Sequence, residues 1–155
     1  MGRRTLSKRE IKDLIPTLPF VSVFPKQKVE IVTDDKSTVL EIDDKALFFQ
    51  FEGRWLPLLR LIISGEIQVP YKKVTVDMGA IKFVANGADI MRPGITQIED
   101  GISPGDPVLI VDETHGKTLA LGVAMLSSEE MRSASGGKVI KNAHAAGDAL
   151  WELTK

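Results

Sequence analysis

Three glycines divide residues 76–95 of this chain into a strand, a helix and a second strand. The segment reads VDMGAIKFVANGADIMRPGI, and its glycines are Gly79, Gly87 and Gly94. Glycine tolerates positive φ and lets other backbone groups come close, so each position indicates a sharp change of direction. Only folds that can hold such a strand–helix–strand corner are open to the chain.

Local signals define the first half of this corner. Val74 and Val76 alternate with polar residues, as in a half-buried strand. Asp77 is placed to cap a helix over residues 79–84. One face of this helix is expected to be buried through its apolar residues Ala80, Ile81, Phe83 and Val84.

The turns of the segment offer a place for an anion. Asn86-Gly87 predicts a chain reversal with positive φ, and Pro93-Gly94 predicts a type II turn. Gly79 at the helix start would leave the first backbone N–H groups uncovered, and such a corner can hold a phosphate. The alternative is that all three glycines serve only as turn residues.

The segment resembles the signature of PUA domains, RNA-binding modules named after pseudouridine synthases and archaeosine transglycosylases. DMGAIKFVANGADIMRPGI is most similar to the malignant T-cell amplified sequence family and the first half of ligatin, both translation factors. The resemblance covers residues 40–155. Its other segments are residues 46–62, 69–70, 121–125, 127–131 and 144–151.

The resemblance implies where RNA would lie. In PUA domains RNA contacts the glycine-rich helix and an adjoining strand, which here correspond to Gly79, Ala80, Lys82, Asn86, Gly87, Arg92 and Gly94. The glycines would give access to the backbone, Lys82 would add charge, and Arg92 would add a bidentate fork for a phosphate. Lys72 and Lys73 either extend this patch or are solvated linker residues.

The order of elements predicts an α+β protein of two domains. Residues 1–71 are expected to form a small α+β domain that precedes the PUA domain. Its helices are predicted over residues 8–15 and from Trp55 to Gly65, and its strands over 20–24, 29–32, 39–42 and 46–51. Residues 72–155 are expected to form the PUA domain, a pseudo-barrel of short mixed strands with small helices, because closure removes exposed sheet edges.

Aromatic residues are assigned to the core by the same patterns. Phe48, Phe49 and Phe51 lie in a predicted strand and are expected to be buried. No exposed aromatic platform for base stacking can be identified, so recognition of RNA by shape and backbone is expected.

The residue types limit the chemistry. The chain has no cysteine and two histidines, which excludes a thiolate zinc site and leaves no recognisable metal site. His144 precedes Asp148 by four residues, so the two side chains could meet, but no serine or cysteine motif accompanies them. No catalytic residue, metal or cofactor is therefore expected, and the protein is not expected to be an enzyme.

Charge is unevenly distributed although the net charge is only −1. Residues 1–28 carry a net charge of +5, residues 29–73 carry −2 and residues 74–155 carry −4. A basic amino-terminal segment indicates either a localised contact with phosphates or a solvated helix face. The apolar runs are too short to cross a bilayer and no signal-peptide pattern begins the chain, so a cytoplasmic protein is expected.

The function implied by the resemblance is non-enzymatic binding of structured rRNA or tRNA. Its setting would be translation initiation, re-initiation or recycling on the small ribosomal subunit. Eukaryotic members of the family act with a density-regulated protein partner, whereas the compact, cysteine-free chain suits an archaeal version. Two alternatives stay open: an RNA-targeting subunit of an RNA-modification enzyme, and a protein-interaction scaffold without RNA binding.

Overall fold

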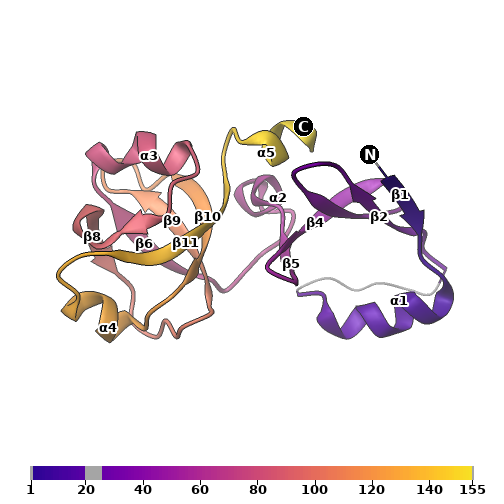
Figure 1. Cartoon of the computed structure of the whole chain (residues 1–155), viewed down its shortest axis with the longest axis horizontal. Helices are drawn as coiled ribbons and strands as arrows, with labels where there is room; N and C mark the ends of the chain where they lie inside the picture. The colour runs from indigo at the N-terminus through magenta and orange to yellow at the C-terminus, as the bar shows by residue number, and fades with distance from the viewer. Residues whose placement is uncertain (1, 20–25, 155) are drawn as a thin grey trace. The chain divides into compact units, whose positions relative to one another are not determined.

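The computed structural model describes residues 2–19 and 26–154 (Figure 1). The chain divides between Val69 and Pro70 into two compact units. The predicted strand over residues 20–24 lies outside the described residues. No helix in the described ranges has the length and apolar character needed to cross a membrane.

The first unit is a five-stranded antiparallel sheet with helices at its connections. In sheet order the strands are β1 (Gly2–Thr5), β2 (Val29–Thr33), β3 (Thr38–Ile42), β4 (Lys45–Phe51) and β5 (Arg54–Pro57). The described helices are α1 (Lys8–Leu14), its 3-10 continuation η1 (Ile15–Thr17), and α2 (Leu59–Ser64). Phe48 and Phe49 are buried as predicted, whereas Phe51 is only half-buried.

The helix predicted from Trp55 begins four residues later than expected. Glu52 and Gly53 have φ of 48° and 81°, and this tight turn sends the chain back along β4 as strand β5. Pro57 ends β5 without disturbing the sheet because β5 is an edge strand. The helix, α2, starts at Leu59 and stops as predicted at Gly65, whose φ is 82°.

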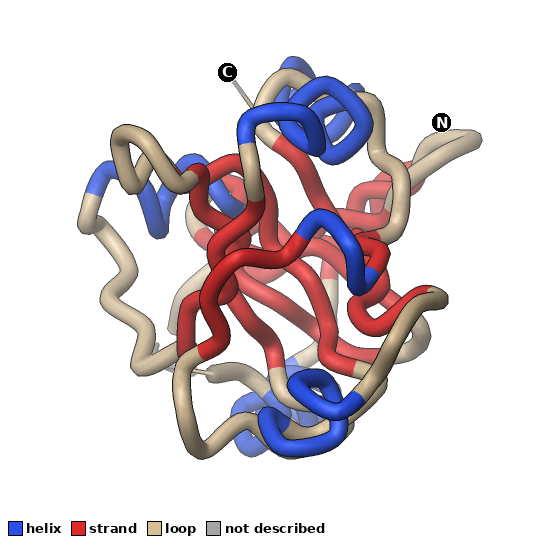
Figure 2. Tube along the Cα trace, turned by 90° about the vertical axis from the view of Figure 1, so that its left-hand side faces the viewer, coloured by secondary structure: helices blue, strands red, loops and turns tan. Residues whose placement is uncertain are grey.

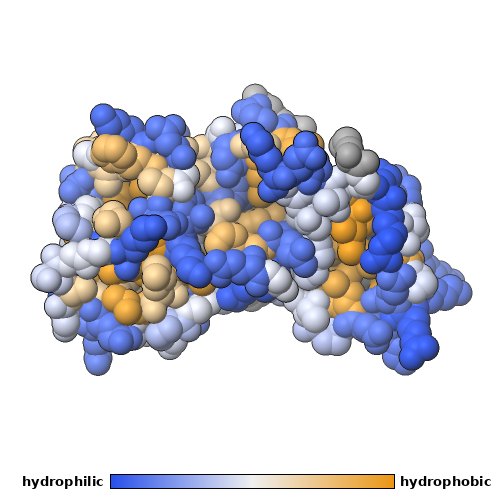
Figure 3. Space-filling model, in the orientation of Figure 1, coloured by the Kyte–Doolittle hydropathy of each residue, from blue (hydrophilic) through white to orange (hydrophobic). Residues whose placement is uncertain are grey.

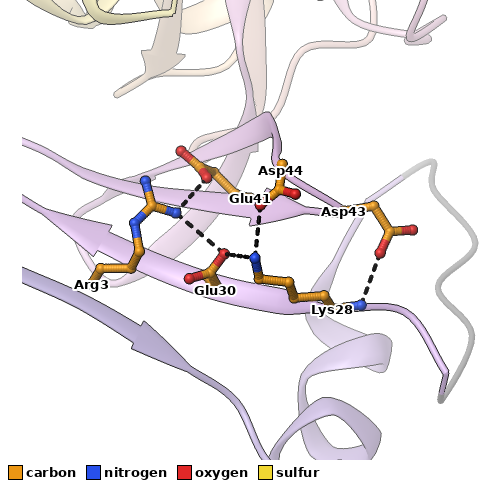
Figure 4. Close-up of polar contacts among 6 residues, drawn as sticks. All are labelled: Arg3, Lys28, Glu30, Glu41, Asp43 and Asp44. Carbon is orange, nitrogen blue, oxygen red and sulfur yellow. Dashed lines mark hydrogen bonds and ion pairs between the residues drawn. The ribbon is translucent and has the colours of Figure 1, made fainter.

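Strand β1 was not predicted, because its four residues are exposed and show no apolar alternation. Ion pairs help to hold it on the sheet (Figure 4): Arg3 Nη1 lies 3.2 Å from Glu30 Oε1 and 2.8 Å from Glu41 Oε1. Glu30 is 3% exposed, and a carboxylate so buried is costly without a cationic partner. The hydrogen bond to Glu41 raises the pKa of Arg3, so Arg3 stays charged.

Lys28 completes this cluster from the other side of Glu30. Its Nζ lies 3.2 Å from Glu30 Oε1 and 2.9 Å from Asp44 Oδ1 (Figure 4). Glu30, Glu41 and Asp44 are close enough together to suggest a metal site. Arg3 and Lys28 already supply positive charge to these carboxylates, so we interpret the cluster as a structural ion-pair network.

The second unit is a curled six-stranded sheet of mixed direction (Figure 2). In sheet order the strands are β7 (Ile90–Met91), β11 (Lys138–Ala145), β10 (Thr118–Ala124), β9 (Pro107–Asp112), β6 (Lys72–Val76) and β8 (Ile95–Ile98). The pair β6–β9 is parallel and the others are antiparallel. This curled, mixed sheet confirms the predicted pseudo-barrel.

Short helices connect these strands. They are η2 (Met78–Ala80), α3 (Ile81–Ala85), η3 (Arg92–Gly94), α4 (Ser128–Ser133) and α5 (Ala149–Leu153). Helices α3 and α4 lie at opposite ends of the curled sheet (Figures 1 and 2). The edge strands β7 and β8 follow each other in the chain, and η3 joins them.

The turn between β9 and β10 depends on Asp112, a buried carboxylate. Its two oxygens accept backbone N–H groups of Thr114 at 3.0 Å, His115 at 2.5 Å and Lys117 at 3.1 Å. The hydrogen bond from His115, followed by those from Lys117 and Thr114, outweighs burial and lowers the pKa of Asp112.

This lowered pKa predicts a pH dependence. Because the folded pKa lies below the unfolded value of about 3.9, the stabilisation is complete above that value and is lost as pH falls through the folded pKa. Urea unfolding as a function of pH should therefore show Asp112→Asn destabilised at neutral pH, with a smaller difference from wild type in acid. Asp35→Asn, at an exposed turn position, is the control. A constant difference for Asp112→Asn at all pH values would contradict the assignment.

Candidate nucleic-acid interface

Strand β6 leads directly into the glycine corner that the sequence predicts. Asp77 caps the helix as expected, because its Oδ1 accepts the N–H of Ala80 at 2.9 Å. The first turn is the 3-10 helix η2, which continues as α3. Gly87 reverses the chain with φ of 88°, which confirms the predicted turn, and Asn86 beside it is exposed.

The backbone N–H groups at this helix start are less available than expected. Asp77 takes the N–H of Ala80, and Glu113 Oε1 accepts the N–H of Met78 at 3.3 Å. Two carboxylates therefore already face the helix start and would repel a phosphate. For Met78 and Ala80 the prediction of uncovered N–H groups is wrong, because the sequence does not show that the β9–β10 turn brings Glu113 here.

Gly94 has a different role from the one predicted. It lies in η3 without positive φ, so the predicted type II turn is wrong. A Cβ added at Gly94 would lie 3.2 Å from the Cβ of Ala80, and Gly94 O accepts the N–H of Asp77 at 2.8 Å. Glycine thus permits close packing of η3 against the corner, where a Cβ would push against Ala80. At Gly79, by contrast, an added Cβ would meet only Asp77 Oδ1, at 3.4 Å.

A cleft of about 610 Å³ opens beside this corner. Its walls are mostly apolar, and three charged residues, Asp77, Asp89 and Lys138, also line it. Lys138 Nζ lies 3.5 Å from Asp89 Oδ2, and Asp89 Oδ1 accepts the N–H of Asn142 at 2.9 Å. The remaining lining residues are Val76, Gly79, Ala80, Phe83, Val84, Ala88, Ile90, Met91, Pro93 and Gly94.

Phe83 lies at this cleft and is 57% exposed, which contradicts its predicted burial. Helix α3 has only five residues, and Val84 is the one that enters the core. Phe83 precedes it by one residue and therefore points about 100° away. Met78 and Met91 are also exposed, each at 46%, and apolar side chains gather over α3 on the molecular surface (Figure 3).

Lys82 is the predicted site residue best placed to meet a ligand at this surface. It is exposed, and its Nζ lies 5.2 Å from the centroid of the Phe83 ring. This is within the range of a cation–π interaction. An aromatic ring and a cation thus stand side by side at the edge of the cleft. The sequence pattern pointed to Lys82 as a site residue but not to Phe83. The available signal for Phe83 was its one-residue offset from the buried Val84.

Lys72 and Lys73 lie at the other end of β6. Both are exposed, and the backbone N–H of Lys73 donates to the carboxylate of Glu99. A five-residue strand spans roughly 13 Å between its first and last Cα atoms. The structure therefore separates these two lysines from the corner that follows Val76.

Arg92 was expected at the surface, but it is half-buried and bound within the fold. Its Nε donates to Met131 O at 2.5 Å, and its Nη1 donates to Ile95 O at 3.3 Å. Its own backbone N–H donates to Gly137 O at 2.9 Å. Arg92 thus connects η3 to the end of α4 and the start of β8.

His144 and Asp148 meet as the sequence suggests, with Nδ1 and Oδ2 2.8 Å apart. His144 is 1% exposed, and Asp148 also accepts the backbone N–H groups of Ala145 and Trp151, each at 2.8 Å. Burial alone would raise the pKa of Asp148. The contact with His144 and the two backbone N–H groups outweigh this effect, so the pKa lies below its ordinary value. This arrangement stabilises the start of α5.

Comparison with known proteins identifies the second unit. The PUA domain family model matches residues 72–146. Translation machinery-associated protein 20 of Saccharomyces cerevisiae is 34% identical, over 94% of this chain and 81% of the yeast protein. Malignant T-cell-amplified sequence 2 of Homo sapiens is 37% identical, over 83% of this chain and 72% of the human protein.

A solved structure extends this similarity to the whole chain. The crystal structure of a hypothetical protein from the archaeon Pyrococcus horikoshii matches with a TM-score of 0.75 and 31% identity. The match covers 99% of this chain and 100% of the archaeal one. The chain therefore belongs to the PUA-domain family of Translation machinery-associated protein 20 and the malignant T-cell-amplified sequences.

Proposed function

We propose that the protein binds structured RNA, rRNA or tRNA, as a non-enzymatic translation factor on the small ribosomal subunit. It would act in translation initiation, re-initiation or recycling, and it would be located in the cytoplasm. The yeast relative, Translation machinery-associated protein 20, has a name that refers to the translation machinery, and this supports the proposed setting. The observation that carries the proposal is the apolar cleft with Phe83 and Lys82 at its edge.

The geometry favours an unpaired nucleotide as the group that enters the cleft. The exposed Phe83 ring offers a face on which a base can stack, and Lys82 beside it can neutralise a phosphate. The carboxylates of Asp77 and Asp89 line the same cleft and can accept hydrogen bonds from amino groups of a base. Gly79, Ala80 and Gly94 form its wall. Three further predicted contact residues do not line the cleft and would lie near the bound RNA; they are Asn86, Gly87 and Arg92.

The test is binding of fluorescently labelled tRNA and of purified small ribosomal subunits across a salt series. Phe83→Ala should weaken binding about 5- to 150-fold, because loss of one stacked base costs about 1–3 kcal/mol. Lys82→Gln should reduce the slope of log K against log salt by about 0.7–0.9. Met125→Ala, at an exposed apolar residue that does not line the cleft, is the matched control and should bind like wild type.

Three outcomes would contradict parts of the proposal. If Phe83→Ala binds as tightly as Met125→Ala, the cleft is not the RNA contact. If wild-type protein binds free tRNA but not ribosomal subunits, the RNA-modification subunit becomes the better interpretation. If it binds neither RNA at low salt, the chain is not an RNA-binding protein, and an interaction scaffold remains.

A further inference from the structure

Part of the positive charge of residues 1–28 is neutralised by ion pairs within the fold. Arg3 and Lys28 pair with the carboxylates around Glu30, and Arg4 Nη1 lies 2.5 Å from Glu10 Oε2. Within the described part of the chain, no such ion pair is formed by the exposed basic residues of α1, which are Lys8, Arg9 and Lys12. Apart from exposed Lys26, the positive charge left for a partner in this segment is therefore concentrated on one helix.

These three cations occupy one side of α1. Lys8 and Lys12 are about one turn apart and therefore lie on the same side of the helix. Each residue turns the helix by about 100°, so adding Arg9 widens the arc around the helix axis to about 100°. The acidic residues of the helix, Glu10 and Asp13, lie outside that arc and line a separate groove of about 470 Å³. The surface over α1 is hydrophilic (Figure 3). We call Lys8, Arg9 and Lys12 the cationic face of α1.

The position of this charge works against the local stability of the helix. Lys8 and Arg9 are the first two residues of α1, where the helix dipole favours negative side chains and disfavours positive ones. Ser7 and Glu10 already cap this end through their side chains. The two cations therefore contribute nothing to the cap, and a residue that breaks a local stability rule without a structural gain is expected to serve binding.

We propose that the cationic face of α1 is a second binding surface for the phosphate backbone of RNA, separate from the cleft beside α3. This inference rests on the proposed function only in that the partner is RNA. Three exposed side chains with flexible stems suit backbone phosphates, which carry charge but no sequence information. The first unit would then add affinity, and the cleft would select the unpaired nucleotide.

The experiment compares two triple variants of the full chain with identical net charge. The first, Lys8→Gln/Arg9→Gln/Lys12→Gln, removes the cationic face. The control, Lys26→Gln/Lys36→Gln/Lys117→Gln, removes three exposed lysines elsewhere. The probe is fluorescently labelled, protein-free small-subunit rRNA, titrated at several salt concentrations. The first variant should bind about tenfold more weakly than the control near physiological salt, and its salt slope should be smaller by about 2.

A stability measurement separates binding from folding. Because Lys8 and Arg9 oppose the helix dipole, Lys8→Gln/Arg9→Gln should melt at or above the wild-type temperature while binding rRNA more weakly. Equal affinity and equal salt slope for the two triple variants would overturn the proposal. If the first triple variant loses only binding to intact subunits and not to protein-free rRNA, the face contacts a protein and the proposal also fails.

A failure of the proposal for the cationic face of α1 can be distinguished from a failure of the proposed function. If wild type binds rRNA and Phe83→Ala weakens it, but the cationic-face variant matches its control, only this second surface is rejected. If wild type does not bind rRNA at all, both are rejected.

Discussion

Gly122→Val is expected to destabilise the second unit by about 3 kcal/mol. Gly122 lies in β10, at a register shift between β10 and β11. A Cβ at this position would lie 2.6 Å from Ile140 Cγ2 and 2.9 Å from the backbone oxygen of Lys141. Ile140 is fully buried and the Lys141 oxygen belongs to a paired strand, so neither atom can move without opening the sheet.

Hydrogen exchange monitored by NMR would measure this effect locally. Amide protection in β9, β10 and β11 should fall sharply in Gly122→Val, and the melting temperature should drop. Gly136→Val is the matched control, because Gly136 is exposed, has no positive φ and has open space around its Cβ position. Comparable protection in the two variants would show that the close approach at Gly122 can relax.

Arg92→Gln is expected to cost about 2 kcal/mol of folding free energy, because hydrogen bonds from a charged donor are worth more than neutral ones. The guanidinium reaches the carbonyl oxygens of Met131 and Ile95, and Met131 is fully buried. Without it, η3 loses its link to α4, and Gly94 is no longer held against Ala80 at the wall of the cleft. Arg92 would thus act as a positioning residue for the cleft.

The salt dependence of RNA binding distinguishes positioning from direct contact. Arg92→Gln should lower both the melting temperature and the affinity while leaving the slope of log K against log salt unchanged. Lys82→Gln should instead reduce the slope of log K against log salt and leave the melting temperature unchanged, because Lys82 is exposed. A reduced slope with an unchanged melting temperature in Arg92→Gln would instead support the phosphate fork that the sequence suggests.

Local signals were sufficient for several caps and turns, although not for the start of α2 or for the turn at Gly94. Asp77 caps its helix by accepting an N–H only three residues away, Gly87 adopts the predicted positive φ, and α2 ends at Gly65 as predicted. Each feature depends on groups within one turn of the chain, so residue type and spacing contain the necessary information. The class of the fold, an α+β chain with a mixed curled sheet, followed from the order of elements together with the family resemblance and is confirmed.

Features that depend on distant residues could not be read in this way. Arg92 finds its acceptor 39 residues away, and Arg3 finds Glu30 at a separation of 27. Strand β1 has no apolar alternation and becomes a strand only because β2 pairs with it. Trp55 fits a helical spacing, yet the turn at Gly53 places it in a strand beside β4.

The candidate site shows the same division. The sequence by itself determined the glycine corner, the exposed Lys82 and the cap at Asp77, since these arise from local backbone preferences. Only the tertiary structure decided that Phe83 is exposed at a cleft, that Glu113 occupies the helix start and that Arg92 is held inside the fold. Burial and hydrogen-bond partners depend on which strands and turns pack around a residue, and that packing is settled only when the whole sheet has closed.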